Sequence, residues 1–292
     1  GATEALTATL LALTDEGDEV VTFEPFYDSY AAVIGLSKAK HVTVPLRAPD
    51  FQPDAADLRK AVTDRTRIIL INDPHNPTGT VLSKETLSLI VLLAHQHDAI
   101  IVTDEVYEHL TFGVPHIPIA TLPGARERTV TISSGGKTFN TTGWKIGWIT
   151  ARADLVDAIL AVKQFLTYVN GAPFQPAIAV GLGLPSSYFL QAAGVLQGKR
   201  DLLTAGLARA GFTVTHPQGG YFVIADAAPL GFANAADFCR ALPALAGVVA
   251  VPVSAFVREQ HVEGYASLVR FAYCKKMELL EQASTQLKQL QH

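Results

Sequence analysis

The sequence has few of the features that mark metal-binding or disulfide-linked proteins. Its two cysteines, Cys239 and Cys274, form neither a CxxC nor a metal-type spacing. The histidine pair His95 and His97 offers too few ligands for a metal ion, which in proteins usually has at least three. We therefore expect no metal site, and we expect both cysteines to be reduced thiols, as is usual in the cytoplasm.

Long apolar runs and clusters of basic charge are also missing. No apolar run approaches the roughly 18–20 residues of a membrane span. The chain has 27 acidic and 23 basic residues, a net charge of −4, and no basic block. We therefore expect a cytoplasmic protein with no membrane segment, and charge implies no nucleic-acid partner. With 292 residues, 49% of them hydrophobic, the chain is long enough for one large or two ordinary domains.

Short β-type runs alternate with helical patterns in the first half of the chain. Six runs rich in valine, isoleucine and threonine predict strands at Val20–Phe23, His41–Leu46, Arg67–Asn72, Ala99–Thr103, Thr129–Ser133 and Lys145–Thr150. Several are apolar throughout, which is typical of strands covered on both faces. Between them, Lys84–His97 has apolar residues at helical spacing. This alternation predicts an α/β fold with a mostly parallel sheet and right-handed connections.

The pattern changes to α+β near residue 185. A predicted helix over Ala153–Tyr168 is followed by the breakers Gly171–Pro173 and Gly181–Pro185. The predicted elements after them are a helix at Ser187–Ala210, strands at Gly220–Ala225, Val248–Val253 and Leu268–Tyr273, a helix near Ala235–Leu242 and a terminal helix. We predict a large domain over residues 1–184 and a small C-terminal domain over residues 185–292.

Polar side chains follow three of the predicted strands. Asn76, Asp104 and Lys137 each come within four residues of a strand end, and Tyr107 and Ser134 lie close to them in sequence. Ligands of open α/β sheets bind beyond the carboxyl ends of the strands. These residues are therefore candidates for one shared site.

The residue types suit a cofactor that has an aldehyde and a protonated ring. Lys137 offers the amine that an aldehyde needs. Asp104 offers a buried carboxylate that keeps a ring nitrogen protonated by charge pairing. Tyr107 and the amide of Asn76 are hydrogen-bond donors for a ring oxygen, and Tyr27 is available to cover the ring face.

A phosphate on such a cofactor needs a cation, hydroxyl groups and a helix start. Lys145, Ser134 and the backbone of Ala2 and Thr3, at the start of the first predicted helix, can supply these. Taken singly, the candidate residues are equally typical of helix caps, turns, core aromatics and surface charges. The prediction therefore depends on their combination.

Three strings of residues carry a family resemblance. His75-Asn76-Pro77-Thr78-Gly79, Thr103-Asp104-Glu105-Val106-Tyr107 and the run from Ser133 to Trp148 match fold-type I aminotransferases of the class I/II group in order and spacing, including the step of eight residues between the two lysines. The glycine before Lys137, and Lys145 where many relatives have arginine, resemble the branch of kynurenine/glutamine aminotransferases and actinobacterial N-succinyldiaminopimelate aminotransferases.

The resemblance implies the fold type I of pyridoxal-phosphate transferases, a three-layer α/β/α sandwich with a smaller C-terminal α+β domain. It implies pyridoxal 5'-phosphate as cofactor, with a Schiff base to Lys137. The catalytic residues would be Lys137, Asp104 and Tyr107. The cofactor-binding residues would be Ala2, Thr3, Tyr27, Asn76, Asp104, Tyr107, Ser134, Lys137 and Lys145. The resemblance also implies a homodimer that acts on an amino acid and a 2-oxo acid.

Arg270 resembles the arginine that binds the substrate α-carboxylate in this family, together with Asn76. A guanidinium fork matches a carboxylate by two parallel hydrogen bonds. From the residues alone, a structural ion pair explains Arg270 as well. The expected substrates are N-succinyl-L,L-2,6-diaminopimelate and 2-oxoglutarate. A kynurenine-, glutamine- or methionine-type aminotransferase, or a C–S β-lyase, is the alternative.

The first residues, Gly1–Glu4, run directly into an apolar helical segment, which is typical of the middle of a domain. Members of the resembling family have a further segment before this point that lines the substrate mouth. We therefore expect that a segment is missing. An inactive truncated fragment, or the aminotransferase-like half of a regulator, stays open as an alternative, although no DNA-binding helix-turn-helix is present in the sequence.

Overall fold

The computed structural model describes residues 1–291. Its first sheet has six strands in the order β2-β1-β3-β4-β5-β6. The strands are β1 (Glu19–Glu24), β2 (Lys40–Pro45), β3 (Thr66–Asn72), β4 (Ile100–Asp104), β5 (Thr129–Ser134) and β6 (Gly147–Thr150). β1 to β5 are parallel, and β6 is antiparallel to β5. The predicted mostly parallel α/β sheet is confirmed.

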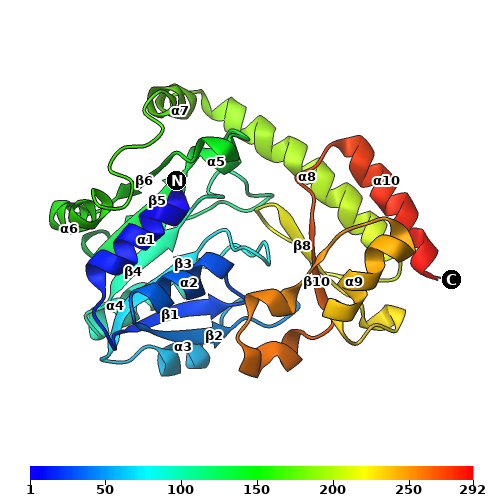
Figure 1. Cartoon of the computed structure of the whole chain (residues 1–292), viewed down its shortest axis with the longest axis horizontal. Helices are drawn as coiled ribbons and strands as arrows, with labels where there is room; N and C mark the ends of the chain where they lie inside the picture. The colour runs from blue at the N-terminus through cyan, green and yellow to red at the C-terminus, as the bar shows by residue number, and fades with distance from the viewer. Residues whose placement is uncertain (292) are drawn as a thin grey trace.

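Helices cover both faces of this sheet (Figure 1). α1 (Ala2–Leu13), α2 (Asp28–Leu36) and α6 (Ala153–Lys163) share a core on one face, and α3 (Ala55–Ala61) and α4 (Lys84–Gln96) share a core on the other. Side chains of β3 alternate between the two cores: Ile68 and Leu70 face α1, whereas Ile69 and Ile71 face α4. Burial on both sides explains why these strands are apolar throughout.

A second sheet lies to the right in Figure 1, with the strand order β7-β8-β10-β9. Its strands are β7 (Thr213–Val214), β8 (Phe222–Asp226), β9 (Val251–Pro252) and β10 (Leu268–Ala272), and its helices are α8 (Ser186–Arg209), α9 (Ala235–Ala246) and α10 (Met277–Leu287). Tyr107, Leu110 and Phe112, which follow β4 of the first sheet, are buried in the core of the second. The segment that contains Tyr107 therefore connects the two sheets.

Three sequence predictions were wrong in their bounds. The strand predicted over Val248–Val253 shortens to β9 (Val251–Pro252), because only these two residues pair with β10. The helix predicted over Ala153–Tyr168 ends at Lys163, because Phe165 and Tyr168 are 84% and 77% exposed and gain no burial that would stabilise further turns. The strand predicted from Lys145 begins only at Gly147. Lys145 has a left-handed backbone with φ of 56°, which no strand accommodates.

Two further helices connect the sheets, α5 (Gly135–Thr138) and α7 (Phe174–Leu182). α7 meets α8 at a bend of 93°. No single helix within residues 1–291 has the length and apolar character of a membrane span; the bent α7–α8 pair fits by length and composition alone.

Candidate functional site

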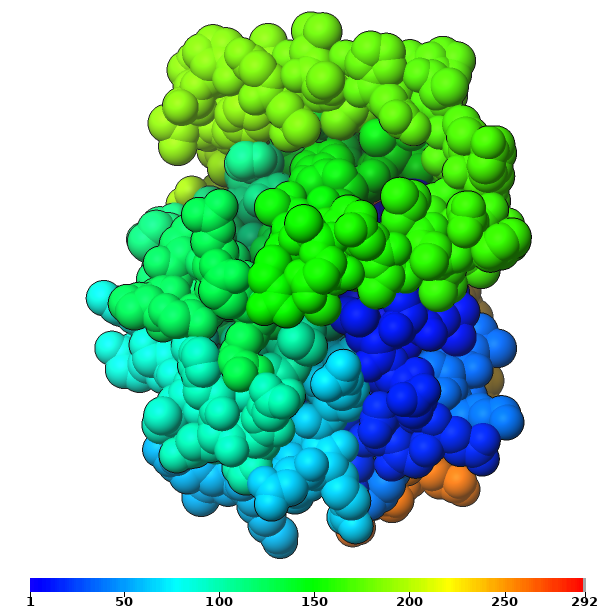
Figure 2. Space-filling view, turned by 90° about the vertical axis from the view of Figure 1, so that its left-hand side faces the viewer, coloured from blue at the N-terminus to red at the C-terminus, as the bar shows by residue number. Residues whose placement is uncertain are grey.

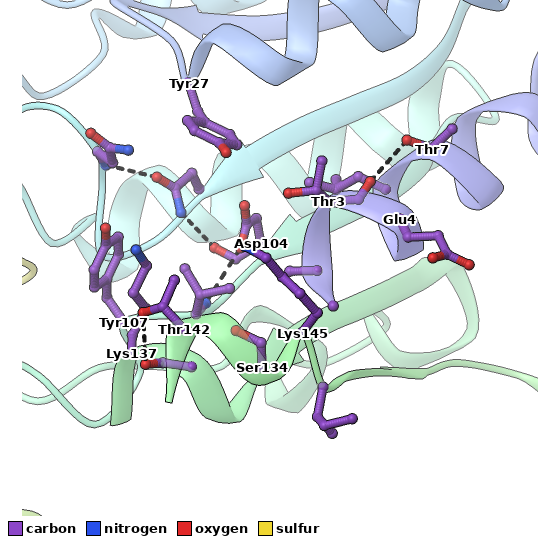
Figure 3. Close-up of a pocket in the computed structure, with 18 of the residues that line it drawn as sticks. Thr3, Glu4, Thr7, Tyr27, Asp104, Tyr107, Ser134, Lys137, Thr142 and Lys145 are labelled. Carbon is purple, nitrogen blue, oxygen red and sulfur yellow. Dashed lines mark hydrogen bonds between the residues drawn. The ribbon is translucent and has the colours of Figure 1, made fainter. Parts of the chain in front are cut away.

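A cavity of about 710 Å³ lies at the carboxyl ends of β3, β4 and β5, beside the first turn of α1 (Figure 3). Nine of the ten predicted site residues line it: Ala2, Thr3, Tyr27, Asn76, Asp104, Tyr107, Ser134, Lys137 and Lys145. The tenth, Arg270, lies on β10 and donates a hydrogen bond of 3.1 Å from Nη1 to Oδ1 of Asn76. Residues spread over most of the chain therefore meet at one place.

The ends of β3 and β4 are joined by side-chain hydrogen bonds. Asn72 and Asp104 are opposite each other in the parallel register. Nδ2 of Asn72 donates to the backbone oxygen of Asp104 at 2.8 Å, and Oδ1 of Asn72 accepts from the backbone N–H of Asn76 at 2.7 Å. Asn72, which the sequence analysis did not select, thus fixes two of the predicted site residues relative to each other.

The carboxylate of Asp104 is buried, with 4% exposure. Its Oδ2 accepts a hydrogen bond of 2.8 Å from the hydroxyl of Tyr30, another residue that the sequence analysis missed. Burial raises the pKa of Asp104 to about 6, although the hydrogen bond from Tyr30 and the charge of Lys137 act in the opposite direction. A cationic ring nitrogen next to this carboxylate would stabilise its ionised form.

Lys137 lies on the short helix α5, and its amine is enclosed by aromatic rings. Its Nζ is 5.8 Å from the ring centroid of Tyr107 and 5.4 Å from that of Tyr221. The Tyr221 hydroxyl donates to the backbone oxygen of Lys137 at 2.5 Å. Burial lowers the pKa of Lys137, which increases the neutral fraction of the amine. Burial also raises the pKa of Tyr107, so its hydroxyl remains a hydrogen-bond donor.

The other end of the cavity is open and polar (Figure 3). Ser134 ends β5, and Lys145 is exposed at the turn before β6. Within residues 1–291 neither side chain has a hydrogen bond or ion pair. A Cβ at Gly147 would lie 2.7 Å from the backbone nitrogen of Ala2, so only glycine allows β6 to approach the start of α1 this closely. A helix start, a hydroxyl and an ammonium group together favour an anion.

Arg270 has no acidic partner within the described chain. Its guanidinium carbon lies 4.1 Å from the ring centroid of Phe222 and 4.3 Å from that of Phe256. Burial lowers the pKa of Arg270, but a guanidinium group stays charged at neutral pH. The structural ion pair that the sequence left open is therefore not found, and Asn76 provides the hydrogen-bond acceptor instead.

The family described as aminotransferase class I and II matches residues 1–287, and the chain belongs to this family of transferases. It is 47% identical to the probable N-succinyldiaminopimelate aminotransferase of Mycobacterium tuberculosis, over 98% of this chain and 75% of that protein. The solved structure of the N-succinyldiaminopimelate aminotransferase from M. tuberculosis superposes with a TM-score of 0.96 at 48% identity, over 99% of this chain and 76% of the other.

Other relatives have different substrates in their names. The methionine aminotransferase of Escherichia coli is 35% identical over 99% of this chain and 75% of its own length. The kynurenine–oxoglutarate transaminase of Dictyostelium discoideum is 34% identical over the same shares of the two chains. The predicted family, fold type and transferase class are confirmed.

The family uses pyridoxal phosphate, and the residues of this cavity fit that cofactor. The volume is within the 300–1,000 Å³ typical of small-molecule sites. The buried carboxylate of Asp104 matches a cationic ring nitrogen, and the amine of Lys137 matches an aldehyde. At the open end, Lys145 and Ser134 match a phosphate. The cofactor prediction is confirmed by the family, while the role of each residue stays a proposal.

Proposed function

We propose that this aminotransferase acts on N-succinyl-L,L-2,6-diaminopimelate and 2-oxoglutarate, in the synthesis of diaminopimelate and lysine. The observation that supports this substrate is the likeness to the M. tuberculosis enzyme, at 48% identity and a TM-score of 0.96. The next relatives are 34% to 36% identical, and their names give other substrates.

Bound pyridoxal phosphate supplies an aldehyde that takes up the amino group and a protonated ring that disperses negative charge. Lys137 would hold the aldehyde of the cofactor. Its free amine would take the α-proton of the amino acid as a general base. Its lowered pKa supports this role, because only the neutral amine accepts a proton.

Asp104 would hold the proton on the ring nitrogen, because its buried carboxylate is stabilised by a positive charge next to it. Tyr107 and Asn76 would donate hydrogen bonds to the 3'-oxygen of the ring, and Tyr27 would cover the ring. Lys145, Ser134 and the backbone N–H groups of Ala2 and Thr3 would hold the phosphate. All of these residues line the one cavity.

The substrate carboxylate binds the guanidinium of Arg270, with Asn76 beside it. This role is supported by the hydrogen bond between the two residues and by the lack of an acidic partner for Arg270 in the described chain. We also infer that residues 1–184 form the cofactor-binding domain and residues 185–292 the smaller domain. The substrate would then contact both domains, because Asn76 belongs to the first and Arg270 to the second.

The Lys137→Ala variant tests the assignment of the catalytic amine. The protein reconstituted with pyridoxal phosphate should have the visible absorbance of a lysine-bound cofactor, and the variant should lose this absorbance together with at least about 100-fold in turnover. The Lys60→Ala variant, which removes an exposed lysine of α3, is the control. Absorbance that survives in Lys137→Ala would contradict the assignment.

A donor screen tests the substrate. We expect the highest kcat/KM with N-succinyl-L,L-2,6-diaminopimelate as amino donor, compared with kynurenine, glutamine and methionine. Higher kcat/KM with one of the latter would establish the alternative that the E. coli and Dictyostelium relatives support. Release of a thiol, pyruvate and ammonia from a cysteine S-conjugate would identify a C–S β-lyase.

We further infer a cytoplasmic homodimer. Twelve large apolar side chains within residues 160–195 of the described chain are exposed: Leu160, Phe165, Leu166, Tyr168, Val169, Phe174, Val180, Leu182, Leu184, Tyr188, Leu190 and Val195. In Figure 2 the yellow-green part of this segment, which holds α7 and the start of α8, forms a ridge across the top of the face, and the green part lies below it. Leu166 also lines the cofactor cavity, so a second copy on this surface would adjoin the site. Free thiols at both cysteines agree with the cytoplasm.

The dimer is tested by light scattering coupled to size-exclusion chromatography. The wild-type protein should have twice the chain mass, and the double variant Phe165→Ser/Leu190→Ser should shift to the monomer. Leu36→Ser, at an exposed leucine outside this surface, is the control. A wild-type protein with the mass of one chain would contradict the proposed dimer.

A further inference from the structure

A buried ion cluster lies directly behind the residues that face the cofactor cavity. Asp73 and Glu105 follow the paired residues Asn72 and Asp104, and neither lines the cavity. The ring of His116 lies between the two acids. Its Nε2 is 3.1 Å from Oε2 of Glu105, and its Nδ1 forms an ion-pair contact of 3.3 Å with Oδ2 of Asp73. The three side chains are at most 6% exposed.

The orientation of both acids is fixed by their remaining oxygens. Oδ1 of Asp73 accepts from the backbone N–H of Leu82 at 2.9 Å. Oε1 of Glu105 accepts from the hydroxyl of Thr103 at 3.1 Å. His116 therefore bridges two fixed carboxylates on neighbouring strand ends. On the cavity side, the amide of Asn72 joins the same two strand ends.

The charges of the cluster act on Asp104. Burial on its own lowers the pKa of His116, but the charges of Asp73 and Glu105 and the hydrogen bond with Glu105 raise it to about 10, so the ring is cationic at neutral pH. The nearby His109 has its pKa lowered by burial and by the charge of His116. The charge of Glu105 raises the pKa of Asp104. A cation on His116, in contact with Glu105, has the sign that would offset that effect.

We propose that His116 is a positioning residue that fixes the ends of β3 and β4 and balances the charge of Glu105, so that the carboxylate of Asp104 stays ionised in the cavity. His116 touches neither the cavity nor Asp104 and acts only through Asp73 and Glu105. The inference relies on the role of Asp104 in the proposed function. The experiments measure protonation and cofactor binding, so they remain informative even for a protein that transaminates none of the tested donors.

The first experiment is a nitrogen NMR titration of the cofactor-free protein labelled with ¹⁵N-histidine. The ring signals of His116 are assigned with the His116→Gln variant or, if that variant does not fold, by through-space contacts. They should report a ring that is protonated on both nitrogens through pH 8 and that titrates near pH 10. A signal that is already neutral at pH 8 would overturn the proposal, because a neutral ring cannot balance Glu105.

The second experiment measures the affinity of the cofactor-free protein for pyridoxal phosphate between pH 5 and pH 8. Loss of the cation in His116→Gln should raise the pKa of Asp104 by about one unit and weaken binding at pH 5 about tenfold. In Glu105→Gln/His116→Gln the affinity should return to within about threefold of wild type, because the uncompensated charge is removed as well. His97→Gln removes an imidazole from a surface ion pair with Asp64 and should change nothing.

Equal weakening of cofactor binding in the single and double variants would assign His116 a packing role only and would overturn the proposed charge balance. The balance would also be overturned if the pH at which cofactor binding is half lost did not change in His116→Gln. The Glu105→Gln single variant keeps the proposal open to test even if His116→Gln does not fold. It should lower the pH at which cofactor binding is half lost, since one source of the raised pKa of Asp104 is removed. No such shift would also contradict the proposal.

Discussion

The two ends of the cofactor cavity are built differently. At the ring end, Asp104, Asn76 and Tyr107 are less than 10% exposed, and hydrogen bonds from Tyr30 and Asn72 fix this end before any ligand is present. At the phosphate end, Ser134 and Lys145 are accessible and have no partner within residues 1–291. The protein therefore fixes the side chains of one end by hydrogen bonds, whereas the polar groups of the other end receive their partner from the ligand.

This comparison predicts its largest effect at Asp104. The Asp104→Asn variant keeps the shape of the ring end but removes its charge, so turnover should fall roughly 100- to 1000-fold. The pH dependence of cofactor binding below pH 7 should also disappear, because the group with a pKa of about 6 is gone. Asp64→Asn at a side chain that is 94% exposed is the control. A variant that turns over within threefold of wild type would contradict the proposed role of Asp104.

The phosphate end should show an intermediate effect that depends on the ligand. Lys145→Ala should weaken the binding of pyridoxal phosphate about 10- to 100-fold, since one charge-assisted hydrogen bond is lost. The binding of pyridoxal, which has no phosphate, should not change. An equal loss for both ligands in an equilibrium titration would show that Lys145 acts on the ring end instead.

A smaller effect is expected at Tyr30, which contacts Asp104 but does not line the cavity. Loss of its hydrogen bond in Tyr30→Phe should raise the pKa of Asp104 from about 6 by about one unit. Because the ionised form of Asp104 binds the cofactor, the acid-side midpoint of binding should rise by the same amount. Tyr265→Phe, whose hydroxyl bonds the backbone of Glu24 and Leu46, is the control. If the acid-side midpoint of cofactor binding does not change in Tyr30→Phe, Tyr30 does not influence the ionisation of Asp104.

The sequence predicts the parts of the fold and site that depend on local pattern. Runs rich in valine, isoleucine and threonine give β1 to β5 within one residue, and burial on both faces favours such runs in the central strands β3 and β4. The residues at the ends of β3, β4 and β5 are also predicted, because parallel strands bring their carboxyl ends to one edge.

The parts that were missed depend on contacts between distant residues. Tyr30 and Asp104 are 74 positions apart, and no spacing rule connects them. His116 is an ordinary loop histidine in the sequence and becomes an ion bridge only when β3 and β4 are paired. The end of α6 was also missed, because helical periodicity does not reveal that Phe165 and Tyr168 lie on the surface.

Two consecutive residues at the start of β8, Tyr221 before the strand and Phe222 in it, connect the proposed sites of substrate recognition and catalysis. The Tyr221 hydroxyl bonds the main chain of Lys137, and the ring of Phe222 packs on the guanidinium of Arg270. The supports of the acid-binding group and of the helix that bears the amine are therefore neighbours in the chain. A displacement of β8 would move both contacts together.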